Sequence, residues 1–399
     1  MQMNERIQTI DVLRGLCLFG ILQANLLIFQ YGIWGKDEIS LFSLSPFDTM
    51  SYYAVKLFIE ASFMPIFAFL FGYGMVIMRE RSMERDGKPK RKLARRFLFI
   101  LFLGYLHSTF LWEGDILLTY GMIGFILLLF VARKKKTILI WATILLVLSS
   151  LFGLGAEIAA DSDEEVTSYI KTTNHVYQTG TYLDIKTHRN TSDPGDLLDM
   201  PKEAFLFISV FAIVLITPMF LYGMYAAKRK WFVHPTQEQG RYRKGLLFIP
   251  VGVTLKALPL LFSGIPVLGV LSLPGSYVLA FGYIFLIAYC FAKWRSHPLF
   301  RAAANVGKLS LTNYLLQTVV CTFIFYGYGL GLFSRLGVFF GILLGIVLFS
   351  LQLIGSTYYL KTRKSGPFEW LLRAFTHWTL PWKLTKRKES QNLTPKQSA

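Results

Sequence analysis

The chain has 399 residues, of which 53% are hydrophobic and 17% are charged. A soluble domain usually carries about 25% charged residues. Here the charges, with a net value of +18, are grouped in short blocks between long apolar runs. This pattern excludes an ordinary cytosolic enzyme, a disordered protein and a nucleic-acid-binding module. It predicts an all-α polytopic membrane protein.

Ten apolar runs are long enough to cross a membrane, because a transmembrane helix needs about 20 predominantly apolar residues. The sequence therefore predicts about ten transmembrane helices. They lie at about 10–31, 51–78, 96–112, 115–132, 137–159, 204–227, 245–264, 267–292, 308–329 and 336–360.

Basic residues predict the orientation of these helices. Lysine and arginine dominate five segments, and ten alternating spans put all five on one side. The segments are 79–96, 133–136, 228–244, 293–301 and 361–399. The long segment on the other side, 160–203, is acidic. By the positive-inside rule, both termini are cytoplasmic. We expect a multi-pass protein of a plasma membrane.

This topology divides the chain into four parts. Residues 1–159 form an N-terminal five-helix half, and 204–360 form a C-terminal one. The extracytoplasmic loop between them, 160–203, is long for a connector, so we expect it to have structure or function of its own. The cytoplasmic tail, 361–399, is basic and begins with a tryptophan-containing amphipathic helix, which is typical of a membrane interface.

The first predicted helix carries polar side chains along one face. Asp11 and Arg14 are three residues apart, and Asn25 follows about three turns later. An ionisable residue at membrane depth is costly and is therefore a functional candidate. One interpretation is an ion pair that fixes the helix in the bundle. The other is that Arg14 binds an anionic group entering from the cytoplasm.

The third predicted helix contains His107, the only histidine within a predicted span, and Glu113 and Asp115 follow it. Histidine titrates near neutrality and can act as a general base, which a nearby carboxylate would orient. A structural hydrogen bond inside the membrane is the alternative role.

The ninth predicted helix has a polar face formed by Ser310, Asn313, Tyr314 and Gln317 at spacings of three and four. Lipid cannot satisfy these groups, so the face points into the bundle or into a wet cavity. Hydrogen bonding between helices and substrate binding both fit this pattern. In the second predicted helix, Pro65 predicts a kink.

With these motifs, the sequence resembles the bacterial YeiB-like membrane proteins called the DUF418 family. These are relatives of the heparan-α-glucosaminide N-acetyltransferase group within a transmembrane acyltransferase superfamily. The resemblance runs from end to end. It is carried by Arg6–Asn25 with its Asp-x-Leu-Arg-Gly core, Phe69–Gly74, His107, Gly114–Leu117, Tyr120, Gly180, Tyr182, Arg189, Leu311–Gln317, Gly327–Phe333, Gly366–Trp370, Arg373 and Thr376.

The resemblance implies an activity. The acetyltransferase relatives take an acyl group from cytoplasmic acetyl-CoA and deliver it across the membrane to an amine on a sugar. A histidine in the loop between the first two helices is central in those relatives. The matching segment here, 32–50, has no histidine, so the role of His107 is not carried over from them.

The leading hypothesis is a membrane acyltransferase that moves an acyl group from cytoplasmic acyl-CoA to an extracytoplasmic cell-envelope sugar or lipid. His107 is the expected base, assisted by Asp115 and Glu113. The expected acyl-CoA site comprises Asp11, Arg14, Arg95 and Arg96. The expected acceptor site comprises Asn25, Tyr120, Asn313, Tyr314 and Gln317.

Two alternatives remain open at this point. The first is a transporter of a small anionic or amphipathic solute, with His107 and Asp115 as a proton-coupling pair. The second is a non-catalytic sensor whose 160–203 loop binds a ligand. In every case membrane lipids are partners, and neither a metal nor a nucleic acid is expected. Apolar helix faces with glycine are compatible with a homodimer.

Overall fold

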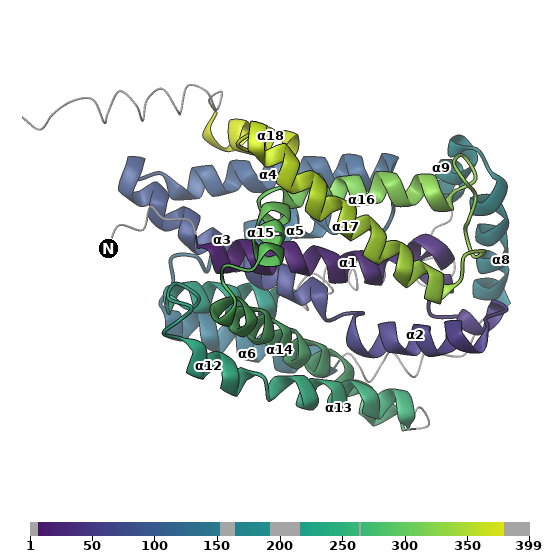
Figure 1. Ribbon diagram of the computed structural model, residues 1–399, viewed down its shortest axis with the longest axis horizontal. Coiled ribbons are helices and arrows are strands. Elements are labelled where there is room, and N and C mark those ends of the chain that lie inside the picture. Colours follow the sequence, from purple (N-terminus) through teal and green to yellow (C-terminus); the bar gives the residue numbers. More distant parts are fainter. Residues whose placement is uncertain (1–6, 152–163, 192–215, 263–264, 379–399) are drawn as a thin grey trace, which may run out of the picture.

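The computed structural model describes residues 7–151, 164–191, 216–262 and 265–378. The regular elements within these ranges are helices joined by turns, with no strand among them (Figure 1). The predicted all-α polytopic class is therefore confirmed.

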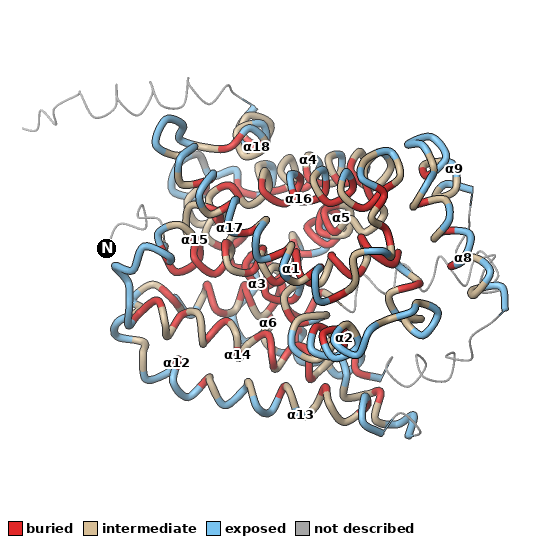
Figure 2. Tube along the Cα trace, turned by 45° about the vertical axis from the view of Figure 1, so that its right-hand side comes forward, coloured by how far each residue is buried: buried red, intermediate tan, exposed pale blue. Residues whose placement is uncertain are grey.

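Helix α1 (Gln8–Gly35) lies in the middle of the bundle, and many of its residues are buried (Figure 2). Its composition explains this position, because apolar side chains occupy all sides of the helix rather than one stripe. The helices that pack against it include α3 (Phe63–Asp86), α14 (Ser272–Lys293), α15 (Pro298–Lys308), α16 (Ser310–Phe325) and α17 (Val338–Thr362).

The contact between α1 and α15 depends on two glycines. A Cβ atom on Gly15 would lie 1.9 Å from the carbonyl oxygen of Ala303. A Cβ atom on Gly307 would lie 1.9 Å from the carbonyl oxygen of Asp11. Small residues at such crossings let two backbones approach closely in a membrane. This contact holds the turn of α1 that carries Asp11 and Arg14.

The second predicted span consists of two helices, α2 (Pro46–Phe58) and α3. The helical structure is interrupted at residues 59–62, where Ala61 has a φ of +56°. Pro65 lies in the first turn of α3, where the missing proline N–H leaves no helical hydrogen bond unmade. The expected kink is therefore a complete break, and it precedes the proline.

The remaining predicted spans correspond to helices of varied length. They are α4 (Pro89–Phe110), α5 (Leu117–Leu127), α6 (Lys135–Leu151), α12 (Gln239–Gly245) with α13 (Phe248–Leu261), η2 (Pro266–Leu271) with α14, α16 and α17. Five helical stretches in the described residues are long and apolar enough to cross a membrane, and α5 and α16 are apolar but shorter. The count of ten spans therefore stays a prediction. Parts of three spans, 152–159, 204–215 and 263–264, lie outside the described residues.

The long segment between the two halves contains helices α8 (Glu164–Thr179) and α9 (Tyr182–Thr191), so it has structure of its own, as expected. The boundaries predicted at 159/160 and 203/204 lie outside the described residues. Figure 1 shows α8 and α9 at one end of the bundle, and the start of α1, α12 and α18 toward the other. Two of the basic segments, those that contain α12 and α18, thus lie away from α8 and α9. The common side of all five basic segments stays a prediction.

The predicted amphipathic helix of the tail is α18 (Pro367–His377), which packs against α4 and α16. Its Glu369 carboxylate accepts hydrogen bonds from the backbone N–H groups of Leu311 (2.8 Å) and Thr312 (3.0 Å). The Thr312 hydroxyl donates to it as well, at 2.6 Å. These bonds satisfy N–H groups that the first turn of α16 leaves without helical partners. The rest of the tail, 379–399, lies outside the described residues.

We expect Gly15→Ala to destabilise the protein by about 1–3 kcal/mol, because the new methyl group would force α1 and α15 apart. Gly74→Ala in α3 is the matched control, since no atom of the described residues lies within 4 Å of its added methyl group. The measurement is the thermal unfolding midpoint of both variants in detergent. Equal midpoints would contradict the role assigned to the α1–α15 contact.

Candidate functional site

His107, Asp115 and Thr318 form a continuous hydrogen-bonded chain inside the bundle. His107 Nδ1 lies 2.8 Å from Asp115 Oδ1, and His107 Nε2 lies 3.0 Å from Thr318 Oγ1. The side chains of His107 and Asp115 are each only 1% exposed. We call these three residues the histidine chain.

The helix ends around Asp115 explain its geometry. Its second oxygen, Oδ2, accepts the backbone N–H of Leu118 at 2.7 Å and so caps the first turn of α5. The capped carboxylate favours the tautomer in which His107 Nδ1–H donates a hydrogen bond to Asp115, and in that tautomer Nε2 accepts from the Thr318 hydroxyl. The Tyr314 ring lies 5.5 Å from the imidazole, and its hydroxyl accepts the N–H of Ile116.

Sequence reasoning missed Thr318, although a signal was present. The polar face of α16 continues at a spacing of four from Tyr314 to Thr318. A threonine in a helix is a weak signal because its hydroxyl can bond to a carbonyl of its own helix, and the Tyr314 carbonyl lies 3.5 Å from Thr318 Oγ1 as an alternative acceptor.

Glu113 does not join the histidine chain. Its Oε1 accepts the Tyr177 hydroxyl at 3.1 Å, and its Oε2 lies 3.4 Å from Arg189 Nη1. Arg189 also donates to the Thr109 carbonyl at 2.9 Å. The structure thus places Glu113 toward α8 and α9, away from the assisting role expected of it beside His107.

Arg14 and Arg373 both lie close enough to Arg96 for their charges to act on it, near the cytoplasmic end predicted for α1. Arg14 is 24% exposed and lies 3.4 Å from Asp11 within α1. Arg96 of α4 experiences repulsion from Arg14 and Arg373 and attraction to Glu369. We call Arg14, Arg96 and Arg373 the arginine cluster. Arg95, which was expected in the same site, instead lies over the Trp378 ring at 5.1 Å.

The residues expected to bind the acceptor are mostly used in contacts between helices. Asn313 donates to Ser356 Oγ at 3.0 Å, and Gln317 donates to Gln352 Oε1 at 2.9 Å. The Tyr120 hydroxyl donates to the Met64 carbonyl at 3.0 Å. For these side chains the structure favours the interhelical alternative. Asn25 is half-buried, and its side chain forms no hydrogen bond within the described residues.

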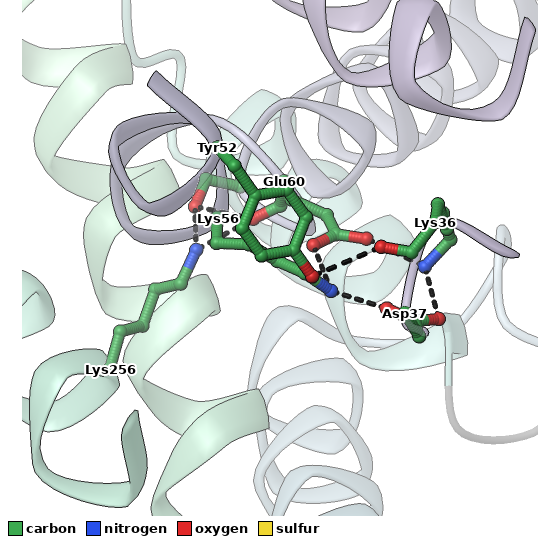
Figure 3. Close-up of polar contacts among 7 residues, drawn as sticks. Lys36, Asp37, Tyr52, Lys56, Glu60 and Lys256 are labelled. Atoms are coloured by element: carbon green, nitrogen blue, oxygen red, sulfur yellow. Dashed lines mark hydrogen bonds and ion pairs between the residues drawn. The ribbon is translucent and has the colours of Figure 1, made fainter. Parts of the chain in front are cut away.

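A second charged group, which sequence reasoning missed, lies at the break between α2 and α3 (Figure 3). Lys36 lies 2.6 Å from Asp37 and 2.8 Å from Glu60. Lys56 contacts Asp37 and lies 2.8 Å from Glu60. Each of the four carboxylate oxygens of Asp37 and Glu60 contacts one lysine ammonium group, so Lys36, Asp37, Lys56 and Glu60 form a closed ion ring. Burial alone would raise the pKa of Asp37, but the two lysines outweigh it and hold that pKa below its ordinary value.

Lys256 of α13 joins the ion ring to a neighbouring helix. Its ammonium donates to the Glu60 carbonyl at 2.6 Å and to Ser62 Oγ at 3.1 Å, and the residue is only 8% exposed. Two features of the sequence could have indicated this charged group. Lys256 lies inside an otherwise apolar run, and Lys56 and Glu60 are four residues apart on one helical stretch.

The long apolar helices, with interhelical hydrogen bonds such as those of Asn313 and Gln317 inside the bundle, define a multi-span helical membrane protein. The chain belongs to the family described as "Protein of unknown function (DUF418)", whose model matches residues 226–379. The resemblance stated above is therefore confirmed at the level of the family.

Three bacterial relatives match along nearly the whole chain. The uncharacterized protein YxaH of Bacillus subtilis (strain 168) is 34% identical and covers 96% of this chain and 97% of its own length. The uncharacterized protein YeiB of Escherichia coli (strain K12) is 25% identical, covering 93% and 96%. An uncharacterized 39.9 kDa protein from the amylase 3′ region of Bacillus acidopullulyticus is 26% identical, covering 94% and 95%. No solved structure matches the chain.

We expect Glu60→Gln to lower the free energy of unfolding by about 2 kcal/mol, because it leaves two ammonium groups with one carboxylate. This figure allows for the 22% exposure of the Glu60 side chain. Glu38→Gln is the control, since Glu38 forms no ion pair within the described residues. Chemical denaturation in detergent measures both variants. A Glu60→Gln protein as stable as the control would show that the ion ring contributes nothing.

Proposed function

We propose that the protein is a plasma-membrane acyltransferase. It moves an acyl group from cytoplasmic acyl-CoA to a hydroxyl or amine of an acceptor that enters from the other side. The observation that carries this proposal is the histidine chain, in which a carboxylate, an imidazole and a hydroxyl follow one another at 2.8 and 3.0 Å. The link of this family to transmembrane acyltransferases belongs to the same proposal.

In this mechanism His107 is the general base. Asp115 holds the Nδ1 proton and stabilises the imidazolium that forms during the reaction. Nε2 removes the proton of the acceptor as its oxygen or nitrogen attacks the thioester carbonyl. The C–S bond then breaks, and His107 returns the proton to the departing CoA thiolate. The Thr318 hydroxyl bonds to Nε2 and can turn to the Tyr314 carbonyl when an acceptor arrives.

The arginine cluster supports a donor site at the predicted cytoplasmic end. Guanidinium groups that repel one another favour an anionic ligand, and they bind phosphates well through paired N–H donors. Arg96 and His107 lie on the same helix, eleven residues or about 16 Å apart. The extended pantetheine arm of CoA covers such a distance. A CoA held at the cluster can therefore direct its thioester toward His107 along α4.

Transport is the second candidate function, because one specific feature favours it. The break between α2 and α3 interrupts an otherwise continuous apolar stretch, and charged residues gather there (Figure 3). Interrupted helices of this kind form substrate sites in many transporters. In that case His107 and Asp115 would couple transport to protons.

We expect His107→Gln to reduce acyl transfer by about 10²–10⁴-fold, because the amide cannot accept the proton of the acceptor. Acyl-CoA binding should stay unchanged. The assay follows label from radiolabelled acetyl-CoA into the membrane fraction of vesicles that contain the protein and the native envelope lipids. His175→Gln, a change at an exposed histidine of α8, is the control. Transfer at the wild-type rate in His107→Gln would remove His107 from the mechanism.

We expect Arg14→Lys to weaken acyl-CoA binding about tenfold, because lysine lacks the planar pair of donors that binds a phosphate. Thermal stabilisation by acetyl-CoA and by longer acyl-CoAs, titrated in detergent, measures the change. Arg91→Lys, at an exposed position of α4, should bind as the wild type does. If no acyl-CoA stabilises the folded wild-type protein, the proposed donor site is contradicted. Solute uptake by proteoliposomes then becomes the relevant assay.

A further inference from the structure

An open groove of about 700 Å³ lies where the end of α5 meets the start of α6. We call it the α5–α6 groove. Its lining includes Leu129, Phe130, Arg133, Lys134 and Trp141. None of its lining residues belongs to the histidine chain, the arginine cluster or the ion ring. The groove is therefore separate from the sites described above.

The α5–α6 groove lies at the predicted surface of the membrane. Residues 128–134 connect two helices that are predicted to span it. Hydrogen bonds within this connection keep it compact, because the Val131 N–H donates to the Leu127 carbonyl at 3.0 Å and the Arg133 N–H donates to the Phe130 carbonyl at 2.9 Å. A short, folded connection between two spans stays close to the lipid headgroups. Lipids are therefore the molecules nearest to the groove.

One side of the α5–α6 groove is strongly basic. Residues 133–136 are Arg-Lys-Lys-Lys, and their four side chains are exposed and form no ion pair within the described residues. The sequence has no acidic residue from 117 to 151, the range that covers α5 and α6. Lys135 and Lys136 also occupy the first turn of α6, where the helix dipole disfavours positive charge. An anionic group in the groove relieves this repulsion.

The other side of the α5–α6 groove is apolar and continues along α6. Leu129 and Trp141 are exposed, and the Trp141 ring packs edge-on against Phe130 with 6.1 Å between ring centres. Tryptophan is typical of the membrane interface. Beyond the groove, one face of α6 exposes further apolar side chains at spacings of three and four. They are Ile140, Ile144, Val147, Leu148 and Leu151. This face is suited to contact with acyl chains.

We propose that the α5–α6 groove binds one phospholipid with an anionic headgroup. The lipid phosphate contacts Arg133 and Lys134, and the acyl chains follow the exposed face of α6. A soluble anion would leave the apolar side of the groove uncovered, and a lipid without net charge would leave the basic side uncompensated. Basic pockets beside membrane helices bind anionic lipid headgroups in this way. The inference does not depend on the proposed acyl transfer.

The test measures lipid binding by the full chain in an uncharged detergent. Native mass spectrometry follows titrations with phosphatidylglycerol and with phosphatidylcholine of the same acyl chains. We expect phosphatidylglycerol to bind about tenfold more tightly, because basic residues near a membrane surface attract anionic lipids. The double variant Arg133→Gln/Lys134→Gln should bind the two lipids equally. Arg229→Gln/Lys230→Gln is the matched control, since it removes the same charges from another exposed pair and should keep the preference.

Trp141→Leu is the second variant, and thermal unfolding confirms that each protein is folded. It should weaken binding of both lipids and keep the preference, because it alters the apolar side and removes no charge. Glycerol phosphate, which has no acyl chains, should not displace phosphatidylglycerol. The inference is overturned if the wild type binds both lipids equally, if the Arg133→Gln/Lys134→Gln protein keeps the preference or the control loses it, if Trp141→Leu binds as the wild type does, or if glycerol phosphate displaces the lipid.

Discussion

A polar group at membrane depth must find its partner within the protein, because lipid offers none. This constraint determines how α16 is placed. Asn313 and Gln317 bond to α17 through Ser356 and Gln352. Gln352 returns a bond to the Asn313 carbonyl at 3.0 Å. These bonds fix the rotation of α16, and that rotation directs the neighbouring Thr318 toward His107 on α4.

The same helix is held at its N-terminus by the cytoplasmic tail predicted from the charges. Glu369 of α18 caps α16, and α18 also carries Arg373 of the arginine cluster. The tail thus connects the cationic group to the helix that bears Thr318. A ligand that rearranges the cluster would act on α18, and through its cap on the start of α16. The physical link is a hydrogen-bonded helix end rather than a long-range effect.

Much of the fold follows from the sequence, since apolar runs and basic blocks identify membrane helices without any knowledge of their contacts. The pairing of His107 with Asp115 could also be anticipated, because both lie within one short segment. The role of Glu113 could not be anticipated, because its partner Arg189 lies on a segment far along the chain. The contact of Lys256 with the ion ring could not be predicted for a similar reason. Lys256 meets Glu60 only after α13 has packed beside the α2–α3 break.

The two charged centres of the membrane region differ in what they can do. In the ion ring every carboxylate oxygen already holds an ammonium, so the ring is neutral and offers no vacancy to a solute (Figure 3). Such a ring stabilises the turn between α2 and α3. The histidine chain has a direction, from carboxylate through imidazole to a neutral hydroxyl that can turn away. A general base needs this order of groups, in which a carboxylate orients an imidazole whose other nitrogen can accept a proton, and the closed ion ring does not contain it. The break in α2–α3 therefore supports transport less than the histidine chain supports acyl transfer.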